Sequence, residues 1–448
     1  MQAALDSSIR ANNIVGASAA IIVPDQGTWL GTSGYSVPAT SDTIRSDMLF
    51  GIASITKTYT AAMILKLADD GILSLDDSLH RWIPSFQHVD STITIRQLLQ
   101  HTSGIYDYME HPDWFISLIA DLTRSWPPEE ILSNFLNPPY FPPGASWKYS
   151  NTNYIVAGMI IKAATGNTVS TELHSRFLDP QGLSNTFLEM VDTLTVEIVH
   201  SWADRDFDGE LDDLYPNTNF PAVNSMTWTA GAMIATAEDL AKWAGLLYSG
   251  AFFSQAYMDE MLFFYPIPTP LITGYGLGAI RFEYRGKTFW GHNGSLPGIN
   301  AIMLYSPKDG VSIVVLLNQR PGDGSSGYVF SVAIALVDAY LDYVATGVAD
   351  SNPPSPGDFT LHQNYPNPFN PETAISYQLP VASEVQLIIY NALGQKIRSL
   401  VNGQQSPGLK SVVWDGKNDL GQPVSSGIYF YTLKAGERAQ TKKMLLIR

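Results

Sequence analysis

The sequence predicts two domains: an α/β domain of the α+β type, in which an antiparallel sheet is flanked by helices and a helical subdomain, and then a small all-β sandwich. Strand-like runs lie at both ends of residues 1–345, and helix-like runs lie between them. Residues 346–357 are rich in Pro and Ser, which is typical of a linker. Residues 358–448 contain only short strand-like runs. A chain of 448 residues is also too long for one ordinary domain.

In the first domain, one apolar strand-like run lies early and three lie late. The turn sequences YRGK and PKDG separate the late runs, which favours hairpins and therefore an antiparallel sheet. The middle of the domain has helical periodicity, so a cleft is expected where the sheet meets the helices. The predicted strands cover residues 16–24, 276–284, 299–307 and 311–319, and the predicted helices cover residues 56–71, 93–104, 129–136, 152–166, 236–250 and 328–347.

The second domain is predicted to be a sandwich because short alternating or apolar runs follow one another with turn signals between them. NALG, KNDLGQP and AGER are the turn sequences. The predicted strands cover residues 374–380, 385–391, 395–401, 411–416, 427–436 and 442–448.

Composition excludes several classes of function. The net charge is −16, which disfavours binding to nucleic acids and to anionic membranes. Nine Lys/Arg and six Asp/Glu from residue 358 onward give +3 there, so the preceding part carries −19. No cysteine is present, which excludes disulfides, a thiol nucleophile and Cys-ligated zinc. No apolar run approaches the ~20 residues of a membrane span, and no signal peptide is visible in this sequence.

Ser54 and Lys57 lie one helical turn apart at the start of a predicted helix. Residues three apart share a helix face, so the hydroxyl and the amine can meet. A serine needs a base to become a nucleophile, and a lysine becomes a base when burial lowers its pKa. The alternative is that Ser54 caps the helix and Lys57 is solvated. No other lysine in the chain has a serine three residues before it.

Two further motifs carry side chains suited to the same chemistry. Tyr149 and Asn151 follow a Pro-Gly turn, where a phenol can relay a proton and an amide can bind a carbonyl. His292, Asn293 and Gly294 lie on a predicted strand, and a strand glycine allows close approach of a ligand or another backbone. The alternative for the second motif is an ordinary hairpin strand with a satisfied histidine.

Taken in order, these motifs resemble the three signatures of the penicillin-recognising serine hydrolases. The sequences LLQHTSGI, TAGAMIATAEDLAKW and GYGLG add to the resemblance, which covers about residues 1–345. The most similar branch contains class C β-lactamases, D-alanyl-D-alanine carboxypeptidases, D-aminopeptidases and family VIII carboxylesterases. The resemblance implies the β-lactamase/transpeptidase-like fold and no required cofactor.

The resemblance also implies roles for individual residues. Ser54 would attack a carbonyl to form an acyl-enzyme, and Lys57 and Tyr149 would carry its proton to the leaving group and later activate water. Asn151 would orient the acyl side chain. The backbone N–H groups of Ser54 and Ser295 would form the oxyanion hole.

The third motif departs from the Lys-Thr-Gly or Lys-Ser-Gly of related β-lactamases. His292 supplies a mostly neutral imidazole where those enzymes have an ammonium group. This lowers the expectation of a dedicated β-lactamase. A carboxypeptidase still needs a cation for the substrate carboxylate, and Arg281 or Arg285 is the candidate, depending on strand alternation.

The expected function is therefore an exported serine hydrolase of the D-alanyl-D-alanine carboxypeptidase or D-amino-acid peptidase type, acting on a small-molecule or peptide substrate. One alternative is a family VIII-type carboxylesterase with weak β-lactamase activity. A more distant alternative is a surface binding protein that keeps the fold without turnover, although the intact Ser54, Lys57 and Tyr149 argue against it.

The second domain resembles the type IX secretion sorting domain of Bacteroidetes-like bacteria. The resemblance rests on LHQNYPNPFNPETAISYQLP, IYNALGQKI, WDGKNDLGQPVSSGIYFYTLKAG and KKMLLIR. It implies recognition by the type IX secretion machinery and a secreted or cell-surface location. An ordinary carbohydrate-binding or adhesion sandwich is the alternative.

An acidic segment has part of the spacing of a calcium-binding loop. Position 12 of the loop should be Glu but is Tyr215, so a solvated acidic loop is the favoured interpretation. The candidate ligands are Asp204, Asp206, Asp208 and Asp212, with Gly209 at the turn.

Overall fold

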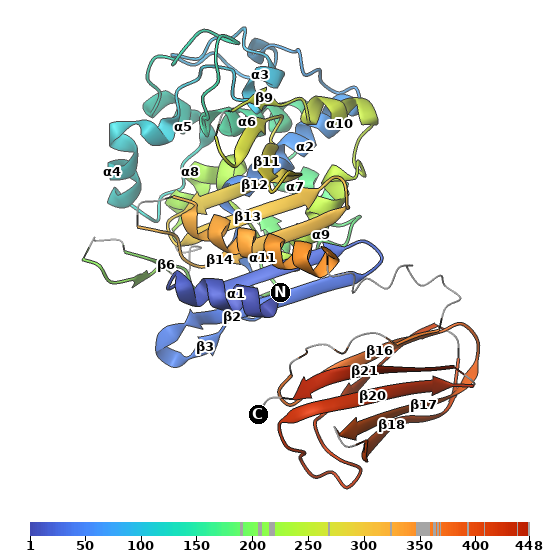
Figure 1. Cartoon of the computed structure of the whole chain (residues 1–448). Coiled ribbons are helices and arrows are strands. Elements are labelled where there is room, and N and C mark those ends of the chain that lie inside the picture. Colours follow the sequence, from blue (N-terminus) through green and yellow to red (C-terminus); the bar gives the residue numbers. More distant parts are fainter. Residues whose placement is uncertain are drawn as a thin grey trace. The chain divides into compact units, whose positions relative to one another are not determined.

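A computed structural model of the whole chain divides it into two compact units, Met1–Ala345 and Thr346–Arg448 (Figure 1). The predicted linker at residues 346–357 lies outside the described residues. The structure describes residues 1–188, 191–204, 208–214, 220–267, 269–322, 325–345, 359–361, 364, 367, 369–391, 394–406, 408–436 and 438–446.

The first unit is built on a nine-stranded sheet in the order β3-β2-β1-β14-β13-β12-β11-β10-β9. Its neighbouring strands are antiparallel, and the two ends of the unit meet where β1 pairs with β14. The predicted α+β fold is therefore confirmed. The strands are β1 (Gly16–Val23), β2 (Gly27–Val37), β3 (Asp42–Thr43), β9 (Tyr265–Pro266), β10 (Ile272–Tyr275), β11 (Ile280–Tyr284), β12 (Lys287–Leu296), β13 (Ile299–Ser306) and β14 (Val311–Leu317).

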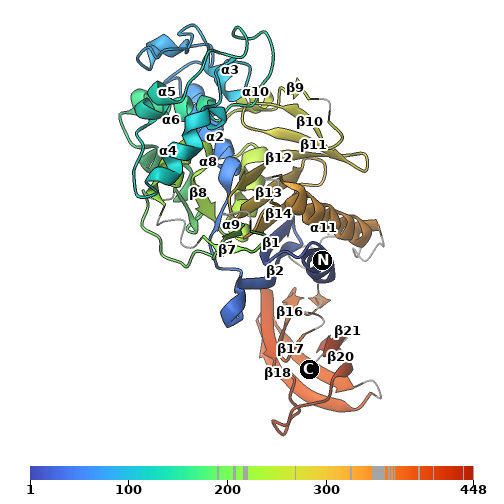
Figure 2. The ribbon, with the colours of Figure 1, turned by 90° about the vertical axis from the view of Figure 1, so that its left-hand side faces the viewer.

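Helices cover both faces of this sheet, which explains why the central strands are almost continuously apolar. Helices α1 (Gln2–Ala11) and α11 (Gly327–Ala345) pack on one face, and α9 (Ala237–Tyr248) packs on the other. Figure 2 shows α11 on one side of β13 and β14 and α9 on the opposite side. Every residue of β13 and β14 is buried as a result.

Helix α11 is the one helix among the described residues that is long and apolar enough to cross a membrane, judged by length and composition alone. The stretch is Gly327–Val344, with a mean hydropathy of 1.4. Val329, Val332 and Leu336 are fully buried in the core between α11 and the sheet. In the structure α11 therefore packs as a helix that covers one face of the sheet.

The remaining helices form the predicted helical part, in which α2 (Thr56–Asp69) is the central element. All but two of its residues are buried, because helices α6, α7, α8 and α10 and the η2 turn (Ala53–Ile55) surround it. A three-stranded sheet, β4 (Phe50–Gly51), β8 (Met233–Ala235) and β5 (Thr186–Leu188), lies beside its start. The other helices are α3 (Ile95–Leu99), α4 (Pro112–Ala120), α5 (Pro128–Asn134), α6 (Thr152–Thr165), α7 (Val169–Leu173), α8 (Pro221–Gly231) and α10 (Gln255–Met261).

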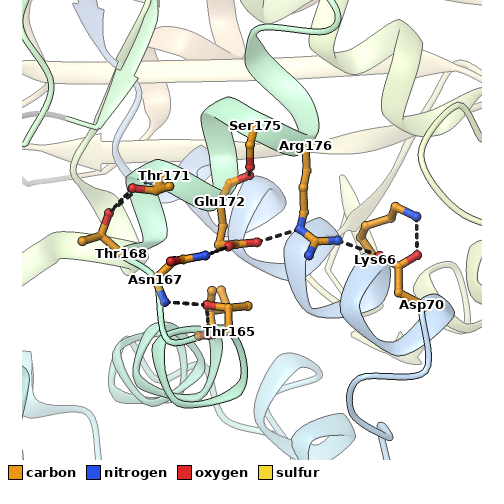
Figure 3. A network of polar contacts seen from close by, with 10 residues as sticks. Lys66, Asp70, Thr165, Asn167, Thr168, Thr171, Glu172, Ser175 and Arg176 are labelled. Carbon is orange, nitrogen blue, oxygen red and sulfur yellow. Dashed lines mark hydrogen bonds and ion pairs between the residues drawn. The ribbon is translucent and has the colours of Figure 1, made fainter.

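A polar network ties the C-terminal end of α2 to α7 (Figure 3). Arg176 donates to Glu172 and to Asp70, each at 2.6 Å, and Lys66 lies 2.5 Å from Asp70. Asn167 donates to Glu172 at 2.6 Å. The Glu172 carboxylate is buried, and two donors satisfy it, as a buried charge requires. The network holds α2 at the end opposite Ser54.

The second unit is the predicted all-β sandwich. One sheet has the order β15-β16-β19 and the other has the order β18-β17-β20-β21. Leu387, Tyr431 and Trp414 are buried together between the sheets. The strands are β15 (Thr360–Leu361), β16 (Thr373–Leu379), β17 (Ser383–Asn391), β18 (Lys396–Gln405), β19 (Gly408–Trp414), β20 (Gly427–Ala435) and β21 (Arg438–Leu446).

Candidate active site

Ser54 lies in a tight turn immediately before α2. The turn, η2 (Ala53–Ile55), is one turn of 3-10 helix, and Ala53 has a φ of 45°, a left-handed value that a small side chain tolerates better than a bulky one. The Thr56 hydroxyl accepts the Met233 backbone N–H at 3.0 Å, which fixes the turn against β8. Ser54 is half-buried in the wall of a cleft of about 500 Å³.

Lys57 faces Ser54 as the sequence spacing predicts. Its Nζ lies 3.1 Å from Ser54 Oγ, 2.8 Å from Asn151 Oδ1 and 2.7 Å from the Ala230 carbonyl oxygen. Lys57 is fully buried, and this burial lowers its pKa to about 7, while the negative charge of Asp107 acts in the opposite direction. The amine therefore changes charge near neutral pH instead of remaining an ammonium group.

Tyr149 completes a three-residue cluster with Ser54 and Lys57. Lys57 Nζ lies 5.0 Å from the centre of its ring, and both Tyr149 and Ser54 line the cleft. Burial raises the pKa of Tyr149 above its usual value, and the Ser54 hydroxyl acts in the opposite direction with a smaller effect. The phenol therefore keeps its proton at neutral pH, and it can give that proton away if Lys57 returns one to it.

Asn151 also joins the cluster, but its amide is already engaged. Its Oδ1 accepts from Lys57, and its Nδ2 donates to Asp107 Oδ2 at 2.9 Å and lies 3.3 Å from Met109 Sδ. Asn151 lines the cleft, so contact with an acyl side chain remains a prediction. Asp107, which follows the HTSGI sequence by two residues, was not predicted from the sequence.

His101 supports the loop that carries Tyr149, and it too was not predicted from the sequence. Its Nδ1 accepts the Ser150 backbone N–H at 3.2 Å and lies 3.0 Å from Asn153 Nδ2. Its ring centre lies 4.3 Å from that of Tyr149 and 4.7 Å from that of Tyr275. Burial lowers the pKa of His101 well below its usual value, so the ring is a neutral packing element. Its place within the HTSG sequence was the available signal.

The His292-Asn293-Gly294 motif lies on β12 at the opposite wall of the cleft. His292 Nδ1 lies 2.6 Å from the Asn293 carbonyl oxygen, which can only accept, so Nδ1 carries the proton and Nε2 accepts from the Tyr275 hydroxyl at 3.1 Å. Burial lowers the pKa of His292 to about 3, so the imidazole is neutral. Asn293 Nδ2 donates to Ser326 Oγ at 3.0 Å, and Ser295 lines the cleft.

The lining of the cleft offers no permanent cation to a substrate. His292 is the only basic side chain among the described lining residues. Arg281 donates to Thr273 and Arg285 pairs with Asp338 at 2.7 Å, and neither lines the cleft. Ile280 lines it instead, because alternate residues of β11 face opposite sides. The apolar lining residues are Met109, Trp147, Ile267, Ile272, Ile280 and Leu296.

The acidic loop is only partly described. Asp204 Oδ2 accepts the Gly209 backbone N–H at 3.1 Å, and Asp208 Oδ1 accepts that of Glu210 at 2.8 Å. Asp212 lies in the short strand β7 (Asp212–Asp213), whereas Asp206 and Tyr215 lie outside the described residues. Within the described ranges, no group of three or more His, Asp or Glu side chains could hold a metal ion. The solvated acidic loop stays a prediction, with the calcium site as its alternative.

Comparison with known proteins places the first unit in a family. The sequence model of the Beta-lactamase family matches residues 1–334. The chain belongs to the Beta-lactamase family. The fold and the order of the three motifs agree with this membership, so the predicted family resemblance of the first unit is confirmed.

Several known proteins are similar to this chain. "Penicillin-binding protein 4*" of Bacillus subtilis is 27% identical over 64% of this chain and 64% of its own length. A D-stereospecific amidohydrolase of Streptomyces sp. is 28% identical, with a TM-score of 0.66 over 74% of this chain and 98% of its own. The D-amino acid amidase of Ochrobactrum anthropi, complexed with L-phenylalanine amide, is 28% identical, with a TM-score of 0.68 over 78% and 98%. The chain spans 61–64% of the length of the first curated relatives it matches.

The second unit matches a different family. The sequence model of the FlgD Ig-like domain matches residues 368–439. An Ig-like domain is a two-sheet sandwich, which agrees with the architecture of this unit. A role in type IX secretion stays a prediction.

The Gly294 backbone allows β12 to lie directly against the Ser54 turn. A Cβ at this position would come within 2.2 Å of the Ile52 carbonyl oxygen and 3.0 Å of Ala53 Cβ. We therefore expect Gly294→Ala to lower the free energy of unfolding by about 1–3 kcal/mol and to displace Ser54. The measurements are chemical unfolding and the rate at which a fluorophosphonate labels Ser54.

Gly245→Ala is the matched control, because a Cβ there would meet only Ser312 Oγ at an ordinary 3.4 Å. This control should label at the wild-type rate. Equal labelling and equal stability in both variants would contradict the close-approach argument.

Proposed function

We propose that the chain is a serine hydrolase that forms an acyl-enzyme at Ser54, with neutral Lys57 as the base. The observation that carries this proposal is the set of three oxygens around Lys57 Nζ. The Asn151 and Ala230 carbonyl oxygens can only accept, so they take the two N–H bonds of a neutral amine. The remaining lone pair then points at the Ser54 hydroxyl, which is the arrangement a general base needs.

The neighbouring groups support each later step of the reaction. As Ser54 Oγ bonds to the substrate carbonyl carbon, its proton moves to Lys57 Nζ. The protonated Tyr149 hydroxyl then gives a proton to the leaving nitrogen or oxygen and regains one from Lys57. The same groups take a proton from the water that releases the acyl product. Ser54 and Ser295 both line the cleft, which supports their backbone N–H groups as the oxyanion site.

We infer that the substrate is a D-amino-acid amide or a peptide with a D-amino acid at its N-terminus. A peptide whose C-terminal carboxylate lies on the residue after the cleaved bond is the disfavoured substrate. Within the described lining there is no permanent cation to bind such a carboxylate, and the part of the chain before residue 358 carries −19. A negative potential attracts a substrate ammonium group and repels a carboxylate. The two solved relatives named for D-stereospecific amide hydrolysis add support.

A carboxylesterase is the second candidate. The apolar side chains that line the cleft suit the acyl chain of an uncharged ester as well as that of an amide. An amide is harder to cleave because its leaving nitrogen must be protonated, and Tyr149, which lines the cleft with Ser54, is the candidate proton donor. The presence of this phenol supports the amidase.

A substrate panel tests the proposal. We expect D-phenylalanine amide to be hydrolysed with a kcat/KM at least about tenfold above that for a D-alanyl-D-alanine peptide, because the charge difference costs the peptide about one factor of ten or more. Preferred hydrolysis of p-nitrophenyl esters would identify an esterase, and preferred hydrolysis of nitrocefin would identify a β-lactamase.

Ser54→Ala is the covalent control for this panel. Its mass should not change with a fluorophosphonate, whereas the wild-type mass should. Absence of labelling in the wild-type protein would support a non-catalytic binding protein, and preference for the D-alanyl-D-alanine peptide would reject the charge argument.

The pH dependence tests the role of Lys57. Its lowered pKa of about 7 predicts that kcat/KM rises with pH and reaches half its plateau near pH 7, since the protonated form below that pH cannot accept the Ser54 proton. His292 is not the source of this limb, because its pKa is about 3. Lys57→Ala should lose about 10²–10⁴-fold in kcat. A profile that is flat between pH 5 and 9 would contradict the assignment.

We also propose that the second unit directs the protein to the cell surface or the medium through the type IX machinery. The motifs near residues 361–380 and 414–436 support this role. In a bacterium with that machinery, the full chain behind a signal peptide should reach the outside, and a chain ending at Ala345 should remain in the periplasm in active form. Equal export of both chains would reject the role.

A further inference from the structure

We propose that Asp107 is a positioning residue for the reaction. Its buried carboxylate holds the Asn151 amide in the one orientation that keeps the lone pair of Lys57 Nζ directed at the Ser54 hydroxyl. The inference rests on the proposed function, because it concerns the same base. Asp107 does not line the cleft and is not expected to touch the substrate.

The surroundings of Asp107 make it a fixed acceptor. It is only 5% exposed, its Oδ1 accepts the Met109 backbone N–H at 3.1 Å, and its Oδ2 accepts Asn151 Nδ2 at 2.9 Å. Its own backbone N–H donates to the Tyr140 hydroxyl at 3.0 Å, which holds the loop. Burial raises the pKa of Asp107, and the donors that meet both carboxylate oxygens, together with the charge of Lys57, act in the opposite direction and favour the ionised form.

An ionised carboxylate only accepts hydrogen bonds, so it distinguishes the two ends of the Asn151 amide. The NH₂ end must face Asp107, and the oxygen end must then face Lys57, as observed at 2.8 Å. If the amide were reversed, its NH₂ group would face the amine and donate to the lone pair. The lone pair would then no longer be available to the Ser54 hydroxyl.

Asp107 also supplies the negative charge that acts on Lys57. The other titratable groups around the amine are neutral near pH 7, since burial lowers the pKa of His101 and His292 and raises the pKa of Tyr149 and Tyr154. Among the described residues, Asp107 is the group whose charge raises the pKa of Lys57. Removing that charge must therefore move the pKa of the base downward, which a loss of packing alone would not do.

The test is the rate at which a fluorophosphonate labels Ser54, measured from pH 5 to 10 in the full chain. This reaction needs the base but no particular substrate. For Asp107→Asn we expect the plateau rate to fall about 10–100-fold, because an asparagine at 107 can donate and so permits the reversed amide. We also expect the midpoint of the acid limb, the pH range in which the labelling rate rises with pH, to move down by about one pH unit. The loss should consequently be smaller at pH 5.5 than at pH 9.

Asp239→Asn is the matched control, because Asp239 is a buried carboxylate that accepts the Asn185 backbone N–H at 2.8 Å and does not line the cleft. It should leave both the plateau and the limb in place. Asp107→Ser, which is neutral and smaller, replaces Asp107→Asn if thermal melting shows that the latter does not fold, and the same downward limb is expected.

The outcomes separate this inference from the proposed function. A lower plateau with an unmoved limb, or no change at all, would overturn the role of Asp107 while the hydrolase assignment stands. Wild-type labelling without hydrolysis of D-amino-acid amides would reject the proposed substrate. The role of Asp107 would still be supported if the acid limb of Asp107→Asn moves down. A wild-type protein that is not labelled would reject both.

Discussion

The burial of one amine determines how the rest of the site is arranged. Lys57 lies inside a helix that other elements surround, so its charged form is disfavoured and its neutral form must satisfy two N–H bonds. Carbonyl oxygens of Asn151 and Ala230 take those bonds. Because both are acceptors only, the position of the lone pair is fixed by the protein and does not depend on a substrate. Ser54 is placed where that lone pair points.

Four distant segments of the chain must meet for this arrangement to exist. The η2 turn carries Ser54, the loop before α6 carries Tyr149, the end of α8 supplies the Ala230 carbonyl, and β12 carries Gly294. Each contact depends on a small or fixed group, such as the missing Cβ of Gly294 against Ile52. The packing of β12 onto η2 joins the sheet to the helical part, so the cleft forms at the boundary between the two.

The sequence could predict the fold and the reacting pair because both depend on local periodicity. Three-residue spacing brings Ser54 to Lys57, and apolar strand runs predict β13 and β14. Asp107 could not be derived in this way, since its role depends on a hydrogen bond to a residue 44 positions away. The side of the sheet on which Arg281 lies depends on the register of β11, which the sequence does not determine. In the structure Arg281 donates to Thr273 instead of lining the cleft.

A base with a pKa near 7 is sensitive to what enters the cleft. Both the protonated and the neutral amine are populated near neutral pH, because burial lowers the pKa of Lys57 to about 7. An apolar acyl group that displaces water from the cleft lowers the local dielectric and favours the neutral amine further. A substrate ammonium group has the same effect through charge repulsion. Binding of a substrate with both features would therefore deprotonate its own base, whereas a carboxylate beside the amine would hold the proton in place.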